Sequence, residues 1–503
     1  MGAVTTTIDE HAEVIALRQK VSELEEQIAW FKKQVFGQKS EHSGTPDLSK
    51  YEQLALFAEE YAKTEAALKA AETVTHVKAH DRKKAKKLSE KISPDVECVE
   101  ETIDITPEQR VCAPGWKLVP VGRREARTTI EYIPAKLKKT VYYVRTYKKV
   151  RSDGEAEPEF LQAHLPNAVI IRSVVTPSLL AKVIHDKYEL DVPLYRQLNE
   201  WKRLGLTVSE TTLSNWMIES AELMAPIYDR IHECLVRQPF LQGDETPTQV
   251  LKEANRKATD QSYMWVARTV RKSPTPMVYF KYDPHRSQAV AKALYAGFNG
   301  VLQCDGYAGY NGLTIERVGC MAHVRRKFVE ASQVAKTKDY CVPLQLLDQM
   351  FHLENEWRAL SPKARCRRRR SKLKPLLNRF WAWCDKNDAL PKSSLGKAVS
   401  YAENMRPYID RLLKYGEIDL SNNASERNMK SYVMGRKNFL FSTSPDGARA
   451  NAILMSIIET CKANAIDPTT YLTEVLNEMA QYPENRKFEF LGQYLPWNWH
   501  QES

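Results

Sequence analysis

The order of strands and helices after residue 231 constrains this chain more than any other feature of its sequence. An apolar segment leads into Asp244, two more strand-like segments follow, an amphipathic helix comes next, and a fourth strand ends in Asp305; the last four elements are predicted at 263–270, 277–282, 287–298 and 300–304. Three strands joined by short turns, followed by a helical crossover to a fourth, are the opening order of a ribonuclease H-like fold, in which the first and fourth strands lie side by side and parallel. We therefore expect Asp244 and Asp305, each at the polar end of an apolar strand, to face one pocket.

A third acid is offered by the segment 420–430. Glu426 opens a helix-like stretch there, which leads into an apolar helix at 448–461. The gap of 121 residues from Asp305 to Glu426 is twice the gap of 61 from Asp244 to Asp305, and it exceeds what a compact fold requires. These spacings predict a multidomain α/β chain with a ribonuclease H-like catalytic core and a mostly helical insertion at 336–415.

Three carboxylates suit phosphodiester chemistry. Magnesium prefers oxygen ligands and is commonly held by a few carboxylates together with substrate phosphate. Two such ions can activate an attacking oxygen and stabilise a leaving one, so no covalent protein nucleophile is required. We expect Asp244, Asp305 and Glu426 to be both the catalytic and the metal-binding residues, with Mg²⁺ as cofactor and Mn²⁺ as a substitute. Glu245 is the alternative to Asp244, but adjacent strand residues point to opposite faces, so only one of them can enter the pocket.

The charge balance indicates a polyanionic partner. The chain carries a formal net charge of +11, and its Lys and Arg residues gather in runs near residues 83–87, 323–327 and 365–374. Clustered cations gain from counterion release along a phosphate backbone, so we expect double-stranded DNA as partner. The DNA contacts predicted from these runs and from the surroundings of Glu426 are His323, Arg325, Arg326, Arg367, Arg368, Arg427, Arg436 and Lys437.

Four modules are predicted before the core. Residues 8–40 carry apolar positions at alternating three- and four-residue steps, which is typical of a coiled coil and predicts self-association, although a single docked helix would show the same pattern. A helical and basic linker follows at 48–95, and a small β-rich module at 96–166, with its clearest strand at 140–147. Residues 170–230 have the rhythm of a helix-turn-helix, with Gly205 in the turn and Ser209 as cap.

The second helix of that pair is expected at 209–219 and would contact DNA through Thr211, Thr212, Ser214 and Asn215. An ordinary helical hairpin fits this pattern about as well. The catalytic core is expected in two segments, 236–335 before the insertion and 416–465 after it, and a C-terminal region follows at 466–503.

Cysteine usage and hydropathy narrow the class of protein further. The nine cysteines are scattered, and the β-rich module has no Cys-x-x-Cys pair, so we expect reduced thiols and no structural zinc there. Cys320 and His323 have a metal-ligand spacing, but two ligands are too few for a structural site. No apolar run approaches the length of a membrane span and no secretory signal is visible, so we expect no membrane partner and a cytoplasmic chain, associated with the nucleoid when bound to DNA.

Several motifs together resemble the transposases of the insertion sequence 66 family. They include GDETP at Asp244, LQCDGYAGY at Asp305, GCMAHVRRKF at 319–328, SNNASER at Glu426 and GRKNFLF at 435–441, and the similarity extends over about 14–476. The resemblance implies a DDE transposase of ribonuclease H-like fold that cuts at its element's inverted repeats and joins 3′ ends to target DNA. Members usually carry two Cys-x-x-Cys pairs before the helix-turn-helix, whereas this chain has only Cys112 at the first.

Two other functions are compatible with the same residues. A nuclease of this fold would cleave DNA without joining it, and a DNA-binding regulator derived from a transposase would do neither. Three acids in the expected order favour the enzyme. The sequence leaves open whether accessory proteins encoded by the same element take part.

Overall fold

The computed structural model describes residues 135–149, 159–334, 341–483 and 489–499, together with Cys98, Ile130 and Lys487. The chain divides into two compact units, of which one spans residues 37–136 and is described at very few positions. The account below concerns the other unit, from Leu137 onward. The predicted coiled coil and basic linker, most of the predicted β-rich module, and Cys112 lie outside the described residues.

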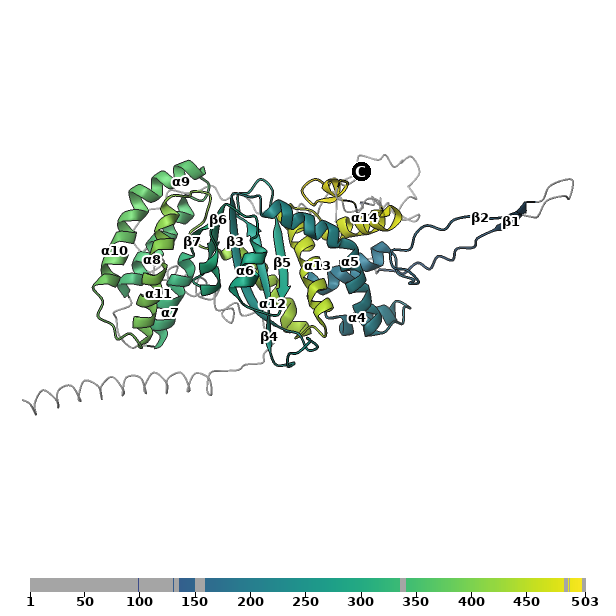
Figure 1. Ribbon diagram of the computed structural model, residues 1–503, viewed down its shortest axis with the longest axis horizontal. Helices are drawn as coiled ribbons and strands as arrows, with labels where there is room; N and C mark the ends of the chain where they lie inside the picture. Colours follow the sequence, from purple (N-terminus) through teal and green to yellow (C-terminus); the bar gives the residue numbers. More distant parts are fainter. Residues whose placement is uncertain are drawn as a thin grey trace, which may run out of the picture. The chain divides into compact units, whose positions relative to one another are not determined.

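A five-stranded mixed sheet forms the centre of this unit (Figure 1). Its strand order is β5-β4-β3-β6-β7, with strands β3 (Phe240–Gln249), β4 (Gln261–Thr269), β5 (Val278–Asp283), β6 (Val301–Cys304) and β7 (Glu316–Gly319). β3, β4 and β5 are antiparallel neighbours, whereas β6 lies parallel to both β3 and β7. The predicted β-β-β-α-β order and the parallel pairing of the first and fourth strands are thus confirmed. The fifth strand, β7, was not predicted.

Alternation along the strands gives the sheet two different faces. Asp244 pairs with Val266 and Glu245 with Trp265, so the two acids belong to opposite faces. One face is covered by α12 (Asn423–Phe439), which packs on β3 and β4. The other holds α6 (Gln288–Leu294) and the short 3-10 helix η5 (Ala308–Gly312).

The free edge of β5 is closed by a helix. α13 (Pro445–Ala463) runs along β5, and two of its hydroxyl side chains bond the strand's backbone: Phe280 N–H donates to Ser456 Oγ at 2.8 Å and Val278 N–H to Thr460 Oγ1 at 3.1 Å. Unpaired edge groups are a template for unwanted strand pairing, so these bonds protect the sheet.

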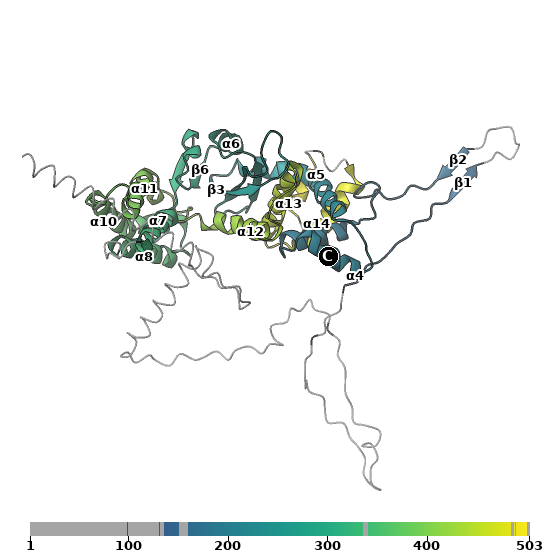
Figure 2. The same cartoon turned by 90° about the horizontal axis from the view of Figure 1, so that it is seen from below.

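A helical subdomain follows β7, with a hydrophobic core of its own. It contains α7 (Met321–Val334), α8 (Cys341–Glu356), α9 (Pro362–Arg368), a π-helical turn η7 (Arg369–Leu373), α10 (Lys374–Asp385), α11 (Ser394–Ile409) and the 3-10 turn η8 (Asp410–Leu413). In both views these helices lie together beyond the β7 edge of the sheet (Figures 1 and 2). The described part of the insertion predicted at 336–415, from Cys341 onward, is mostly helical, and the helical subdomain begins earlier, at α7.

Three helices precede the sheet: α3 (Pro177–Tyr188), α4 (Leu194–Arg203) and α5 (Glu210–Leu235). Gly205 has a positive φ of 94° in the turn between α4 and α5, which glycine tolerates without strain, and Ser209 caps α5 by accepting from Thr212 N–H. The turn and the cap are confirmed. α5 continues to Leu235, well beyond the predicted end at 219, because its later turns are buried against β5 and α13.

The remaining described elements are short or C-terminal. β1 (Thr146–Lys149) pairs with β2 (Glu159–Gln162) in an antiparallel ribbon, so the strand predicted at 140–147 lies further along the chain. α14 (Pro468–Gln481) packs on α3, and a 3-10 turn η10 (Leu491–Tyr494) follows. In the described part of the chain, none of the helices combines the length and apolar character needed to cross a bilayer.

Candidate active site

Asp244 and Asp305 lie at the point where two parallel strands separate. β3 and β6 pair from Phe240↔Val301 to Gln242↔Gln303, and β6 ends at Cys304. The offset between these partners equals the offset between Asp244 and Asp305, so the two acids continue the register just beyond the last paired residues. Asp244 lies inside β3 rather than at its end, since β3 continues in pairing with β4 as far as Gln249.

Glu426 reaches this place from the first turn of α12. The segment before the helix is tied to the sheet by three side-chain amides: Gln242 donates to Ser421 O at 3.5 Å, Gln303 donates to Asp419 O at 2.8 Å, and Asn422 donates to Gly243 O at 3.5 Å. Gln242, Gln303 and Asn422 are buried. These bonds hold the start of α12 against the strand that carries Asp244.

The charges of the three carboxylates influence one another. Burial raises the pKa of Asp244 well above its usual value, and the charges of Glu245, Glu426 and Asp305 raise it further. Burial also raises the pKa of Glu426, where Asp305 acts in the same direction and Arg326 opposes it. A cluster whose members repel one another in this way favours a bound cation.

Backbone amides orient two of the acids. Glu245 N–H donates to Asp244 Oδ1 at 2.9 Å, and Tyr307 N–H donates to Asp305 Oδ1 at 3.0 Å. Both bonds leave the second carboxylate oxygen available for another ligand. The loop after β6 therefore holds Asp305 even though that residue lies outside a strand.

Glu245 is engaged on the opposite face of the sheet. Arg286 donates to its Oε1 at 2.6 Å, Tyr310 donates to its Oε2 at 2.5 Å, and its side chain is 1% exposed. Tyr310 is fully buried and packs edge-on against Trp265. These contacts make Glu245 and Tyr310 part of the core, and they separate Glu245 from the pocket that Asp244 faces.

Three side chains from the β7–α7 region lie beside Glu426. Arg326 Nη2 is 3.4 Å from each of its carboxylate oxygens, and His323 Nε2 is 3.8 Å from Oε1. Candidate metal-binding atoms of Cys320, His323 and Glu426 all lie within 4.8 Å of one another. Burial lowers the pKa of His323 to about 4, and Arg326 lowers it too, so the imidazole is neutral near pH 7.

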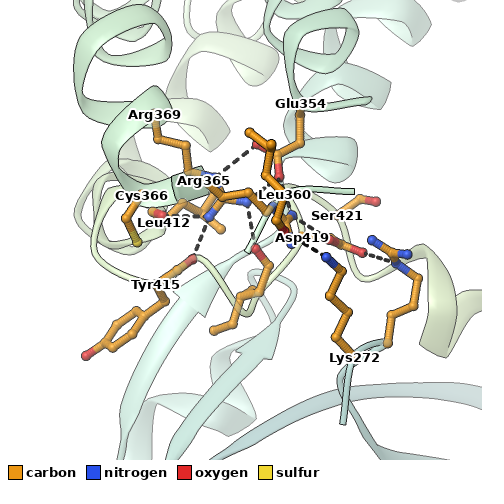
Figure 3. A network of polar contacts seen from close by, with 12 residues as sticks. Lys272, Glu354, Leu360, Arg365, Cys366, Arg369, Leu412, Tyr415, Asp419 and Ser421 are labelled. Carbon is orange, nitrogen blue, oxygen red and sulfur yellow. Dashed lines mark hydrogen bonds and ion pairs between the residues drawn. The ribbon is translucent and has the colours of Figure 1, made fainter. Parts of the chain in front are cut away.

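A buried ion network holds the segment before Glu426 from the other side (Figure 3). Asp419 accepts from Arg365 at 2.6 Å and from Arg271 at 3.1 Å, and Glu354 accepts from both Arg365 and Arg369. Although burial disfavours its charged form, the bonds from Arg271 and Arg365 lower the pKa of Asp419 below its usual value. The network joins α8 and α9 of the helical subdomain to the β4–β5 hairpin and to the residues that lead into α12.

The arginine run at 367–370 divides into two groups. Arg369 is fully buried and donates to the carbonyls of Leu412, Tyr415 and Ile418 as well as to Glu354. Arg367, Arg368 and Arg370 are exposed. Arg367 and Arg368, which are predicted to contact DNA, are thus accessible, whereas Arg365 and Arg369 of the same basic run are buried and paired with Glu354.

The other residues predicted to contact DNA differ in exposure. Exposed or partly exposed are Thr211, Thr212, Ser214 and Asn215 on the first turns of α5, Arg427 beside Glu426, and Arg436 and Lys437 in the last turn of α12. Arg325 is buried and bonded to Asp348 at 2.6 Å, which leaves it poorly placed to reach a phosphate.

A polar pocket beside α12 was missed by sequence reasoning. Its volume is about 320 Å³, and it is lined by Arg268, Arg427, Asn428, Ser431, Glu459, Lys462 and Ala463. Arg268 comes from β4 and donates to Asn428. Burial, together with the charge of Arg427, lowers the pKa of Arg268 to about 10. No pattern in the sequence brings β4, α12 and α13 together, although the position of Arg427 next to Glu426 does predict a DNA contact for that residue.

The geometry and the charges are those of a DNA-processing protein, and comparison with known proteins agrees. Residues 172–450 match the family described as "Transposase IS66 family", residues 456–497 match "IS66 C-terminal element", and residues 23–93 match "Transposase C of IS166 homeodomain". The first match covers more than half of the chain, which therefore belongs to the IS66 family of transposases. The family and the homeodomain match indicate DNA binding.

Two relatives from Sinorhizobium fredii (strain NBRC 101917 / NGR234) illustrate the extent of the similarity. The chain is 30% identical to uncharacterized protein y4jD over 413 residues, which cover 78% of this chain and 79% of that protein. It is 28% identical to uncharacterized protein y4hP over 520 aligned positions, which cover 97% of this chain and 90% of that protein.

Proposed function

We propose that this transposase cleaves phosphodiester bonds at the ends of its mobile element and joins the 3′ ends to target DNA, with Asp244, Asp305 and Glu426 as the catalytic acids. The observation that carries the proposal is geometric: Asp244 and Asp305 continue the parallel register of β3 and β6, and α12, with Glu426 in its first turn, packs on β3. The segments are far apart in the chain. Oxygen ligands from several rigid elements are what a site for a hard divalent cation requires.

The strand order supports a ribonuclease H-like core. Three antiparallel strands, a helical crossover and a parallel fourth strand beside the first put Asp244 and Asp305 in adjacent positions. A helix that follows a long insertion then adds Glu426 on the same face of the sheet.

The residues fit a magnesium site. Their free donors are carboxylate oxygens, and their mutual repulsion is opposed within the cluster mainly by Arg326. Asp244, Asp305 and Glu426 would hold the metal, with Mg²⁺ as the expected ion and Mn²⁺ as a substitute. When bound, such ions activate the attacking oxygen and stabilise the charge on the leaving oxygen.

The protein's own groups position the reactants. Arg326 is close enough to Glu426 to restrain that carboxylate and to approach a phosphate at the same site. No covalent protein nucleophile is needed, because water attacks in the cleavage step and the released 3′ hydroxyl attacks in the joining step.

DNA binding outside the triad is proposed for the exposed cations. The pocket formed by Arg268, Arg427 and Lys462 would receive a backbone phosphate, with Asn428 and Ser431 as neutral hydrogen-bonding groups. Exposed side chains of α5 and of the arginine run would contact DNA further from the chemistry; these are Thr211, Thr212, Ser214, Asn215, Arg367 and Arg368. Arg436 and Lys437 would do so at the end of α12. Self-association through residues 8–40 stays a prediction.

The experiment incubates the purified full chain with a labelled duplex that carries the element's end, in Mg²⁺, Mn²⁺ or chelator. Metal-dependent nicking and joining are expected. Asp305→Asn should reduce both by more than the roughly 10–100-fold typical of a group that only supports a metal ligand. Asp446→Asn makes the same chemical change on an exposed residue of α13 and serves as the control.

Three outcomes separate the alternatives. Nicking without joined product would identify a nuclease. DNA binding without cleavage under every metal would favour a regulator. Cleavage that Asp305→Asn leaves unchanged would contradict the assignment of the triad.

A further inference from the structure

A second set of metal-ligand types shares one residue with the proposed triad. Cys320 precedes α7, His323 lies in its first turn, and Glu426 lies in the first turn of α12. Three of their donor atoms, one sulfur, one nitrogen and one oxygen, are all within 4.8 Å of one another. Cys320 is fully buried, and the side chain of His323 is 16% exposed.

Two backbone contacts hold these segments together. Met321 N–H donates to Leu420 O at 2.8 Å, and Asn422 N–H donates to Cys320 Sγ at 3.4 Å. A spacing of three residues places Cys320 and His323 on one side of a helical turn. The cluster therefore lies where the start of α7 meets the start of α12.

One buried nitrogen of the cluster, Nδ1 of His323, lacks a hydrogen-bonding partner among the described residues. An unpaired polar atom in the interior costs roughly 1–3 kcal/mol, so its presence beside a thiol and a carboxylate calls for a ligand.

We propose that Cys320, His323 and Glu426 form a site for a thiophilic divalent cation of the zinc type. Zinc accepts sulfur, nitrogen and oxygen ligands at about 2.0–2.3 Å, and some point lies within about 2.8 Å of all three donors when none are more than 4.8 Å apart. Small side-chain rotations would thus complete the coordination. Three protein ligands leave a fourth position for water, as in open zinc sites, while magnesium avoids thiolates.

Glu426 belongs to both the zinc site and the proposed triad, so the two sites cannot use it at the same time. Glu426 engaged by zinc is withdrawn from Asp244 and Asp305, so the two sites compete. This consequence rests on the proposed function of the triad, whereas cation binding itself does not.

The test of binding uses cobalt as a spectroscopic probe. The full chain, with a non-thiol reductant and without DNA, is titrated with Co²⁺, and a thiolate-to-cobalt charge-transfer band in the near ultraviolet reports sulfur ligation. We expect one such site per chain that Zn²⁺ displaces and a large excess of Mg²⁺ does not. Cys320→Ala should abolish the band, while His323→Gln and Glu426→Gln should weaken cobalt binding by at least tenfold.

Two control variants test whether the cobalt band depends on Cys320 in particular. Cys461→Ala removes another fully buried thiol, within α13, and Asp305→Asn alters only the triad; both should retain the band. Circular dichroism before each titration shows that the variant is folded. The proposal is overturned if the folded wild-type chain gives no band, or if the band survives in Cys320→Ala.

The competition is tested in the DNA cleavage assay. Zinc added to the Mg²⁺ reaction should inhibit the wild type at least tenfold more strongly than Cys320→Ala, each compared with its own rate in Mg²⁺ alone. Equal inhibition would overturn the competition. Absence of cleavage in Mg²⁺ alone would count against the proposed transposase activity, and the cobalt titration would still decide the cation site.

Discussion

Asp244 illustrates how the site is built at the scale of single residues. The residue is largely buried, one carboxylate oxygen accepts from the backbone of Glu245, and other acids influence its charge. Folding therefore brings together negative charges that are far apart in the unfolded chain. Such a site is a source of instability in the absence of a cation and of affinity in its presence.

Removing one of these charges should stabilise the metal-free protein. Because the pKa of Asp244 is raised by folding, its contribution to stability is present at low pH and is lost as pH rises through the folded-state pKa. At pH 7 we expect Asp244→Asn to raise the unfolding temperature in chelator by on the order of 2 °C, which corresponds to about 1 kcal/mol in a domain of moderate size. Calorimetry in chelator and in Mg²⁺ measures this.

In Mg²⁺ the wild type should have a higher unfolding temperature than Asp244→Asn, because the ion stabilises only the protein that keeps all its ligands. Asp446→Asn should behave as wild type in both conditions. A lower unfolding temperature for Asp244→Asn in chelator would contradict the repulsion inferred from the site.

Arg326 should set the acidic limit of metal binding. Burial raises the pKa of Glu426, and the positive charge of Arg326 lowers it. Removing the guanidinium of Arg326 should therefore raise the pKa of Glu426 further. A carboxylate must lose its proton to bind metal, and Arg326→Gln should therefore move the midpoint of Mg²⁺ binding to higher pH. Calorimetric titrations from pH 5 to pH 8 measure the shift.

The neighbouring cation provides the comparison for this prediction. Lys327 is exposed and pairs with Glu330, so Lys327→Gln should leave the midpoint unchanged. A midpoint that moves to lower pH in Arg326→Gln would show that Arg326 does not act on Glu426.

At the scale of elements, the position of α12 depends on contacts from both the sheet and the helical subdomain. Hydrogen bonds from the side-chain amides of Gln242, Gln303 and Asn422 attach its preceding segment to the sheet. The ion network of Asp419 attaches the same segment to the helical subdomain (Figure 3). The third acid is therefore positioned by elements that do not themselves contact a reactant.

Breaking this network should weaken both folding and metal binding. Asp419→Asn removes the charge that Arg365 and Arg271 share, at an expected cost of about 1–3 kcal/mol, below the 3–5 kcal/mol of a fully buried pair because Asp419 is partly exposed. Metal affinity should fall roughly 10–100-fold, as for other groups that orient a ligand. Chemical denaturation and metal titration of one preparation measure the two effects.

A surface ion pair of the same subdomain is the control. Asp385 and Arg406 are both about half exposed, and Asp385→Asn should change the free energy of unfolding by less than about 1 kcal/mol and leave metal affinity unaltered. If Asp419→Asn lowers stability without changing metal affinity, the network supports the fold and does not position Glu426.

At the scale of the whole described unit, the DNA contacts that we propose lie on two separate surfaces, one beside α12 and one on the helical subdomain. The pocket of Arg268 and Arg427 lies beside α12, whereas Arg367, Arg368 and Arg370 lie on the helical subdomain. This arrangement predicts that a share of the binding energy comes from residues remote from the chemistry.

Neutralising the exposed arginines should reduce the salt dependence of binding. The combined variant Arg367→Gln, Arg368→Gln and Arg370→Gln should lower the slope of log binding constant against log salt by about 1 for each phosphate that the protein no longer neutralises. Fluorescence anisotropy with a labelled duplex measures the slope. Replacing Lys386, Lys392 and Lys397 by glutamine removes the same charge from other exposed positions of the subdomain, and an equal decrease there would show that only net charge matters.

The sequence by itself determined the order of the first four strands and their crossover helix, and it predicted the three acids that we propose as catalytic, because strand alternation, helix periodicity and residue type are local properties. The burial of a side chain and the residues that it contacts depend instead on segments far away in the chain. Only the tertiary structure decided that Arg369 faces the core, that Arg325 pairs with Asp348, and that β7 extends the sheet. It also decided that Glu426 meets Cys320 and His323, which lie about a hundred residues before it in the chain, since long-range packing alone brings α7 and α12 together.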